Sequence, residues 1–133
     1  MAKEAISQGF TGTQKGLSYV GIHAYGYSGP IDVDNNETTL LQFSTGSAYI
    51  KGIFQPQYMV ANAGIATEDY RFIVKFDNQE VSSMLIAEGA DRDAFYNVVN
   101  LIIPPYTTIE ITGANVTDSN TRAVGAIITG KVY

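Results

Sequence analysis

The sequence of 133 residues predicts an all-β protein: a jelly-roll-like antiparallel β-sandwich with an extended N-terminal arm. Three observations indicate this class. Apolar and polar residues alternate with a period of two in several segments, turn residues separate these segments, and long amphipathic helical patterns are absent. The length suits one domain, and a hydrophobic content of 45% suffices for a core. We expect residues 1–17 to form the arm and residues 18–133 a single sandwich domain.

The predicted strands follow one another with turn signals between them. This rhythm is typical of a sandwich or barrel, and so many strands in this length fit two sheets that each bury one face. In chain order the predicted strands cover residues 18–27, 38–43, 47–54, 57–61, 70–76, 79–87, 97–103, 106–112 and 122–133.

The last predicted strand shows the alternation most clearly. One set of its side chains is expected to face the core, namely Val124, Ala126, Ile128 and Val132. Thr129, Lys131 and Tyr133 then face the other way. We therefore expect this strand to be built into the sheet.

The segment 70–76 alternates equally well and is followed by a turn signal. Arg71 and Lys75 share one side of it, and the opposite, apolar side consists of Tyr70, Phe72, Val74 and Phe76. Asp77 and Asn78 come next, and such residues favour the tight turn of a β-hairpin. A hairpin with the segment 79–87 is the result we expect.

The first 17 residues are rich in Gly, Ser, Thr and Gln and contain few large apolar groups, Phe10 and Leu17 among them. Lys3 and Lys15 outnumber Glu4, so the segment is slightly positive while the rest of the chain is acidic. This composition predicts an extended arm rather than a part of the core.

Charge and composition disfavour several classes of partner. Eight Lys and Arg stand against thirteen Asp and Glu, which gives a net charge of −5 and a poor basis for binding nucleic acid or an anionic membrane. We find no secretory signal and no apolar run long enough for a bilayer span, so we expect a soluble protein. The absence of Cys excludes disulfides and Cys-ligated zinc.

The segment 32–37 is the nearest approach to a calcium loop. Asp32, Asp34 and Asn36 have the alternating spacing of oxygen ligands, but Glu37 stands where glycine is needed and Phe43 where the last acid is needed. We predict an ordinary polar turn, with a cation site of another type as the alternative.

A second acidic cluster lies in the segment 88–96, which is also the only place where a short helical turn is plausible. Its carboxylates are Glu88, Asp91 and Asp93. We predict a solvated loop here.

The only histidine, His23, lies in a segment rich in tyrosine. If residues 18–27 form one strand, His23 shares a face with Tyr19, Tyr25 and Tyr27, opposite Val20, Ile22 and Ala24. A single histidine without a nucleophile elbow does not indicate catalysis. Tyrosine is enriched at protein interfaces, so the sequence predicts that Tyr19, His23, Tyr25 and Tyr27 form an oligomer interface.

Two partial glycine motifs do not support nucleotide binding. In the segment 125–131, Val132 follows Lys131 where a phosphate loop needs Ser or Thr. Gly26 and Gly29 match only part of a dinucleotide fingerprint, and no helical pattern follows them. We predict no catalytic, metal-binding or cofactor-binding residues, and we do not expect an enzyme.

Several blocks of the sequence resemble one group of viral proteins. These blocks are residues 17–29, 34–50, 103–111 and 128–133, and they are similar to small virion proteins encoded by tailed bacteriophages of aquatic bacteria. The likeness extends over most of the chain after residue 17. The family looks like the capsid decoration (cement) class, in which jelly-roll or related domains often sit as trimers on the outer capsid surface.

This resemblance implies a structural virion protein that is made in the host cytoplasm and stabilises the shell by binding the major capsid protein. It also implies self-association as a homotrimer, and we expect Lys3, Phe10 and Lys15 of the arm to contact the capsid. A cement protein needs only surface complementarity, because a partner that binds the folded state stabilises the assembly.

Two other functions remain open. One is a receptor-binding or carbohydrate-binding sandwich of a phage fibre or spike, in which exposed tyrosines stack on sugar rings. Loop tyrosines at one end of the molecule would favour this function, whereas tyrosines on the sheet would favour assembly. The other is a small enzyme that uses an acid pair such as Asp32 with Asp34 or Asp91 with Asp93, which would require a cleft.

Overall fold

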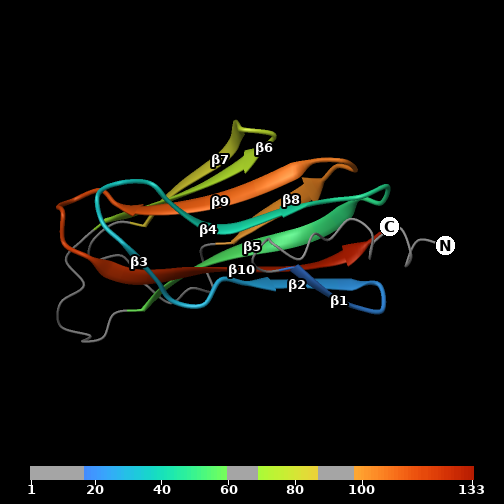
Figure 1. Cartoon of the computed structure of the whole chain (residues 1–133), viewed down its shortest axis with the longest axis horizontal. Coiled ribbons are helices and arrows are strands. Elements are labelled where there is room, and N and C mark those ends of the chain that lie inside the picture. Colours follow the sequence, from blue (N-terminus) through green and yellow to red (C-terminus); the bar gives the residue numbers. More distant parts are fainter. Residues whose placement is uncertain (1–16, 60–68, 87–97) are drawn as a thin grey trace.

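The computed structural model describes residues 17–59, 69–86 and 98–133. Within these ranges the chain forms ten β-strands and no helix (Figure 1). The strands are β1 (Leu17–Val20), β2 (His23–Tyr27), β3 (Ile31–Val33), β4 (Thr38–Ser44), β5 (Ile50–Met59), β6 (Tyr70–Phe76), β7 (Gln79–Ile86), β8 (Val99–Ile103), β9 (Thr108–Asn115) and β10 (Arg122–Val132). None of the described segments is a helix with the length and hydrophobicity that a membrane span requires.

The strands form two antiparallel sheets that pack face to face (Figure 1). The larger sheet has the order β1-β2-β10-β5-β8, with β3 also paired to β10, and the smaller sheet has the order β4-β9-β6-β7. Without the short β1 and β3, each sheet has four strands, and the chain crosses repeatedly from one sheet to the other. This is the double Greek-key arrangement of a jelly roll, and it confirms the predicted fold class.

The core lies between the sheets and confirms the face predicted for the last strand. Val124, Ala126, Ile128 and Val132 are buried, whereas Thr129, Lys131 and Tyr133 are exposed. Both edges of β10 are paired, with β2 and β3 on one side and with β5 on the other. The largest fully buried side chains of the core include Tyr70, Phe43, Phe54 and Phe72.

The hairpin of β6 and β7 is also confirmed. Asp77 and Asn78 have φ values of 50° and 66°, the left-handed conformation that a two-residue hairpin turn requires at both central positions. Tyr70, Phe72 and Val74 are buried, and Arg71 lies exposed on the opposite face. Asn and Asp tolerate this conformation better than other residues with a side chain, so the sequence specifies the turn locally.

The prediction of one strand over residues 18–27 is wrong, because the chain turns back within it. Gly21 has a φ of 62° and reverses the chain, so that β1 pairs with β2 as an antiparallel hairpin. Leu17 begins β1 and is buried, so the sandwich includes one residue that we expected in the arm.

Two further differences concern β3 and β5. The short strand β3 is not among the predicted strands, and the two strands predicted over 47–54 and 57–61 are a single strand that runs through Pro56. Pro56 lies opposite Ala126, whose N–H and C=O both bond to Ser28 on the other side of β10. The missing N–H of proline therefore removes no hydrogen bond between β5 and β10.

Some predictions fall outside the described residues. They are the arm up to residue 16, with Lys3, Phe10 and Lys15, and the acidic segment 88–96, with Glu88, Asp91 and Asp93.

Candidate functional site

The outer face of the larger sheet, meaning the side turned away from the core, carries three of the predicted interface residues. His23, Tyr25 and Tyr27 are exposed along β2 and alternate with the buried Ala24 and Gly26. A strand with one buried face must present every second residue to the outside. The structure thus places these three side chains on one exposed face.

Tyr19 does not belong to this face, and that part of the prediction is wrong. In the β1–β2 hairpin Tyr19 lies opposite Ala24, and directly opposed residues of neighbouring strands share a face. Tyr19 therefore packs against the core, and its burial raises the pKa of its phenol above the ordinary value. Val20, predicted on the face opposite His23, instead lies directly across from His23 on the same face and is 66% exposed.

The strand register arranges the outer face in rows that cross the sheet. The first row, which we call the basic row, runs across β2, β10 and β5 and consists of His23, Lys131 and Lys51. The next row along the same strands consists of Tyr25, Thr129 and Ile53, and the third of Tyr27, Ile127 and Gln55. On β8, Ile102 extends the basic row and is 65% exposed.

A pair of tyrosines continues the outer face beyond the basic row. Tyr49 and Tyr133 exchange backbone hydrogen bonds, with N···O distances of 2.9 and 3.2 Å, so they prolong the β5–β10 ladder by one residue pair. Their rings stack with centroids 5.2 Å apart and planes inclined by 15°. We call them the tyrosine pair. The Nζ of Lys131 lies 5.5 Å from the centroid of the Tyr133 ring, within the range of a cation–π interaction.

Two open grooves cross the outer face. The groove beside the basic row has a volume of about 570 Å³, and its walls include His23, Lys51, Ile53, Asn100, Ile102 and Thr129. The smaller groove has a volume of about 330 Å³ and is lined by Tyr25, Tyr27, Ile127 and Thr129 among others. The outer face is therefore hollowed on both sides of Thr129.

One end of the sandwich collects exposed tyrosines from different loops. The tyrosine pair lies there, and Tyr106 of the β8–β9 loop is 76% exposed. The N–H of Tyr106 bonds to Gly46 in the β4–β5 loop, so the two loops are neighbours. The β1–β2 turn lies at the same end, because Ile22 accepts a hydrogen bond from Val132 (Figure 1). We call this the tyrosine end.

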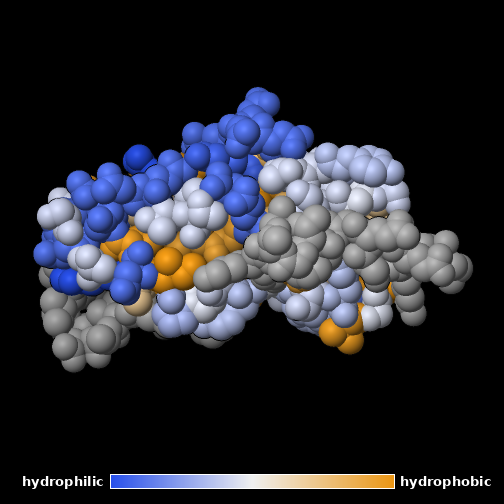
Figure 2. Space-filling model, in the orientation of Figure 1, coloured by the Kyte–Doolittle hydropathy of each residue, from blue (hydrophilic) through white to orange (hydrophobic). Residues whose placement is uncertain are grey.

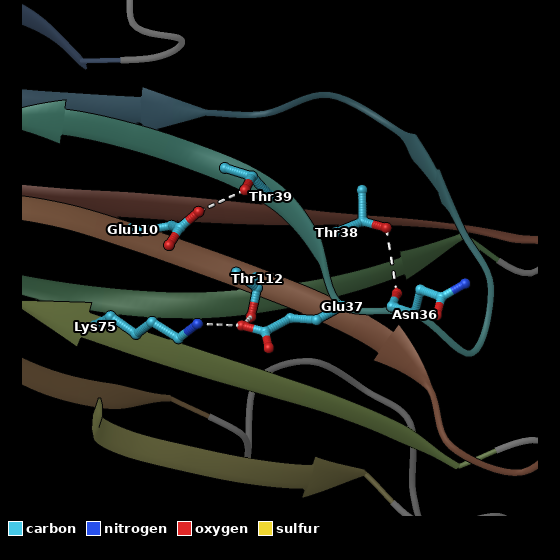
Figure 3. A network of polar contacts seen from close by, with 7 residues as sticks. All are labelled: Asn36, Glu37, Thr38, Thr39, Lys75, Glu110 and Thr112. Atoms are coloured by element: carbon cyan, nitrogen blue, oxygen red, sulfur yellow. Dashed lines mark hydrogen bonds and ion pairs between the residues drawn. The ribbon is translucent and has the colours of Figure 1, made fainter. Parts of the chain in front are cut away.

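The outer face of the smaller sheet is different in character, because charged and hydroxyl side chains bond to one another across it. Glu37 forms an ion pair of 2.6 Å with Lys75 and accepts a hydrogen bond of 2.8 Å from the Thr112 hydroxyl (Figure 3). Glu110 accepts a hydrogen bond from Thr39. Hydrophilic residues accordingly gather over the smaller-sheet layer and at the end with the β9–β10 loop (Figure 2).

The ion pair changes the protonation of both partners. The ammonium of Lys75 and the Thr112 hydroxyl lower the pKa of Glu37 below its ordinary value, because both bond to the ionised carboxylate. The hydrogen bond from Lys75 to Glu37 raises the pKa of Lys75 in turn. These residues hold one another and fix the start of β4 to the smaller sheet.

The segment 32–37 forms a polar turn. The carboxylate of Asp34 accepts the Asn36 N–H at 2.8 Å, as in an Asx turn, and Glu37 points to Lys75. Asp32 is exposed in β3. Among the described residues, no group of three or more His, Asp or Glu side chains could hold a metal ion.

Sequence reasoning missed Lys51, Tyr49 and Tyr106 as parts of a common surface. The alternation placed Lys131 and Tyr133 correctly on the outside, yet their neighbours come from β5, far away along the chain. Only the register of the β5–β10 ladder brings the two lysines and the two tyrosines together. The sequence contained one signal, since Tyr49 and Lys51 are spaced by two residues in the same way as Lys131 and Tyr133.

Known proteins resemble this chain in structure but not in sequence. No family model matches the chain, and neither does any curated protein sequence. Among solved structures, the PRD1 vertex protein P5 is similar with a TM-score of 0.57 and 11% identity, over 87% of this chain and 100% of that one.

Two further structures show weaker likenesses. Disulfide-linked pili of Bacillus endospore appendages have a TM-score of 0.42 at 10% identity, over 86% of this chain and 96% of the other. A glycosylation-associated protein complex (Gap123) from Streptococcus agalactiae has a TM-score of 0.36 at 9% identity, over 95% of this chain and 24% of the other. The chain is thus a β-sandwich whose fold is similar to that of a viral vertex protein.

Proposed function

We propose that the protein is a structural subunit of a phage virion, a spike or fibre module that assembles through its outer face and binds a receptor at its tyrosine end. The exposure of Tyr49, Tyr106 and Tyr133 at that end carries the proposal. Exposed aromatic side chains offer large, rigid contact area at a low cost in side-chain entropy. The jelly-roll likeness to the PRD1 vertex protein P5 supports a place at a vertex.

The outer face supplies the surface for self-association in this proposal. Tyr25 and Tyr27 are about half exposed, at 46% and 52%, and line the smaller groove together with Ile127. Tyrosine and aliphatic side chains of this kind are typical of the buried centre of an interface. A homotrimer fits the resemblance to decoration proteins, and closed symmetry would cover the same part of this face, the smaller groove around Tyr25 and Tyr27, on every subunit and leave the basic row open.

Capsid cementing remains the second candidate, and the resemblance of the sequence to decoration proteins favours it. In that function the exposed outer face would bind the major capsid protein on the outside of the head and stabilise the shell by mass action. Both candidates act by binding and need neither a catalytic residue nor a cofactor.

An assay in which purified protein competes with phage particles for the host surface distinguishes the two functions. Purified protein added to host cells should occupy the receptor and slow the attachment of phage particles if the protein is a spike or fibre module. A Tyr49→Ala, Tyr106→Ala double variant should lose this inhibition while keeping the circular dichroism of the wild type. Unchanged adsorption at saturating protein would contradict the receptor function and favour the cement function.

A further inference from the structure

The tyrosine pair and the basic row lie next to each other on the outer face. Tyr49 precedes Lys51 by two residues, and Tyr133 follows Lys131 by two residues, so all four side chains point to the same side of the sheet. Successive residues on one face are about 7 Å apart along a strand. A stacked aromatic pair and a pair of cations therefore form one continuous patch.

The two lysines of this patch repel each other, which reduces the stability of the fold. Lys51 and Lys131 lie directly opposite each other, and like charges in directly opposed positions destabilise a sheet. Among the described residues neither Lys51 nor Lys131 has a carboxylate within 4.0 Å, unlike Lys75, which forms an ion pair with Glu37 on the other sheet. An anion bound between the two ammonium groups would relieve their repulsion.

The larger groove extends this patch across the sheet. Lys51 and His23 stand in its wall, Asn100 and Thr129 add an amide and a hydroxyl, and Ile102 adds an exposed apolar surface. A site with a few polar groups among apolar side chains is typical of small-molecule recognition. The combination of ring faces, hydrogen-bonding groups and cations corresponds to a ligand with an apolar face, hydroxyls and a negative charge.

We propose that this patch binds an acidic glycan, a chain of pyranose sugars that carry carboxylates. The tyrosine pair offers a ring face for the apolar side of one pyranose, Lys51 and Lys131 bind the carboxylate, and Asn100 and Thr129 bond to hydroxyls along the groove. This inference rests on the proposed receptor function and names the chemical class of the receptor.

The charge distribution favours this ligand over nucleic acid. The chain has a net charge of −5, and the acidic residues of the described part lie mainly on the smaller sheet and in loops. A long polyanion would meet these carboxylates, whereas a short acidic sugar chain meets only the basic row. The outer-face rows from His23 to Gln55 contain no Asp or Glu.

Calorimetric titration of the full chain with tetragalacturonic acid tests the proposal, with neutral tetragalactose as the matched control ligand. The acidic tetramer should bind at least about tenfold more tightly than the neutral one, and raising the salt to about 0.5 M should weaken it severalfold. Excess inorganic phosphate should compete only weakly. Equal affinity for both tetramers, or full displacement by phosphate, would overturn the assignment of an acidic glycan.

Substitutions test which side chains bind the acidic glycan. The double variant Lys51→Gln, Lys131→Gln should weaken binding by about tenfold or more, because it removes both charges that face the carboxylate. Arg71→Gln removes one charge from the opposite sheet and should change nothing. Tyr49→Phe keeps the ring and should bind like the wild type, whereas Tyr49→Ala should bind severalfold less tightly.

Wild-type affinity in the lysine double variant would overturn the proposal, and because both lysines are exposed this variant should fold. Thermal unfolding of each variant checks that the fold is intact. Failure of glycan binding is distinguishable from failure of the receptor function, because the adsorption assay reports any receptor, whatever its chemistry.

Discussion

At the scale of single residues, Glu37 and Lys75 form the ion pair that ties the start of β4 to the smaller sheet. Replacing Lys75 with Gln should reduce the free energy of unfolding at pH 7 by about 0.2 to 1 kcal/mol, the range of partly exposed pairs. The pKa of Glu37 is lowered in the folded protein, so its ionised form favours folding above the unfolded-state pKa.

The destabilisation caused by Lys75→Gln should depend on pH, because Glu37 must be ionised to pair with Lys75. The stabilisation is lost as the pH falls through the lowered folded-state pKa of Glu37, so the difference between wild type and Lys75→Gln should shrink as the solution becomes strongly acidic. Urea unfolding at pH 7 and at about pH 3 measures it. A difference of equal size at both pH values would show that the ion pair is not its cause.

At Gly130 the surrounding atoms leave too little space for a side chain. A Cβ at this position would lie 2.8 Å from the carbonyl oxygen of Lys51 and 2.8 Å from Cγ2 of Ile50. We expect Gly130→Ala to lower the free energy of unfolding by about 1 to 3 kcal/mol, as overpacking does. In the matched variant Gly52→Ala the nearest atom is 3.2 Å away, so the loss measured by chemical denaturation should be smaller. An equal loss in both variants would contradict this account.

At the scale of elements, β10 is the strand on which the larger sheet depends most. Ile128→Asp should be severely destabilising, because it removes a fully buried aliphatic group worth about 2 to 5 kcal/mol and buries a charge. Thr129→Asp, one residue further on the exposed face, should cost far less. Unfolding of the dissociated chain is the appropriate measurement, since Thr129 lines both grooves. A harmless Ile128→Asp would contradict the assigned register.

The sequence predicted those elements whose signals are local. The hairpin of β6 and β7 follows from alternation and from Asp77–Asn78, and the buried face of β10 follows from its period of two. The β1–β2 hairpin was missed because alternation continues through Gly21 and only its positive φ reverses the chain. Likewise, the break predicted between residues 54 and 57 does not occur, because the lost N–H of Pro56 matters only on the side where a partner strand needs it.

At the scale of the whole molecule, the outer face is expected to join subunits. Replacing Tyr25 and Tyr27 with Asp should convert the proposed trimer to a monomer, because charges would be desolvated at the centre of the contact. Mass measurement in solution at micromolar concentration tests this, with Tyr106→Asp at the tyrosine end as the control that stays trimeric. A wild-type protein that is strictly monomeric, in solution and on particles, would contradict the assembly.

The candidate surface was predictable only in part. Alternation alone placed His23, Tyr25 and Tyr27 on one exposed face, and it placed Lys131 and Tyr133 on the outside of β10. The patch itself requires β5 to lie beside β10 in one register, and that pairing joins segments about half the chain apart. Such long-range pairing depends on how the whole sandwich closes, which no local pattern specifies.

The location of the protein in purified particles tests the central claim most directly. Cryo-electron microscopy of the phage, with copy number from quantitative mass spectrometry, would show where the jelly-roll domains sit. A spike or fibre module predicts few copies, confined to vertices or to the tail, with the tyrosine end pointing away from the particle. Domains that cover the whole head in proportion to the major capsid protein, or particles that lack the protein, would contradict the account.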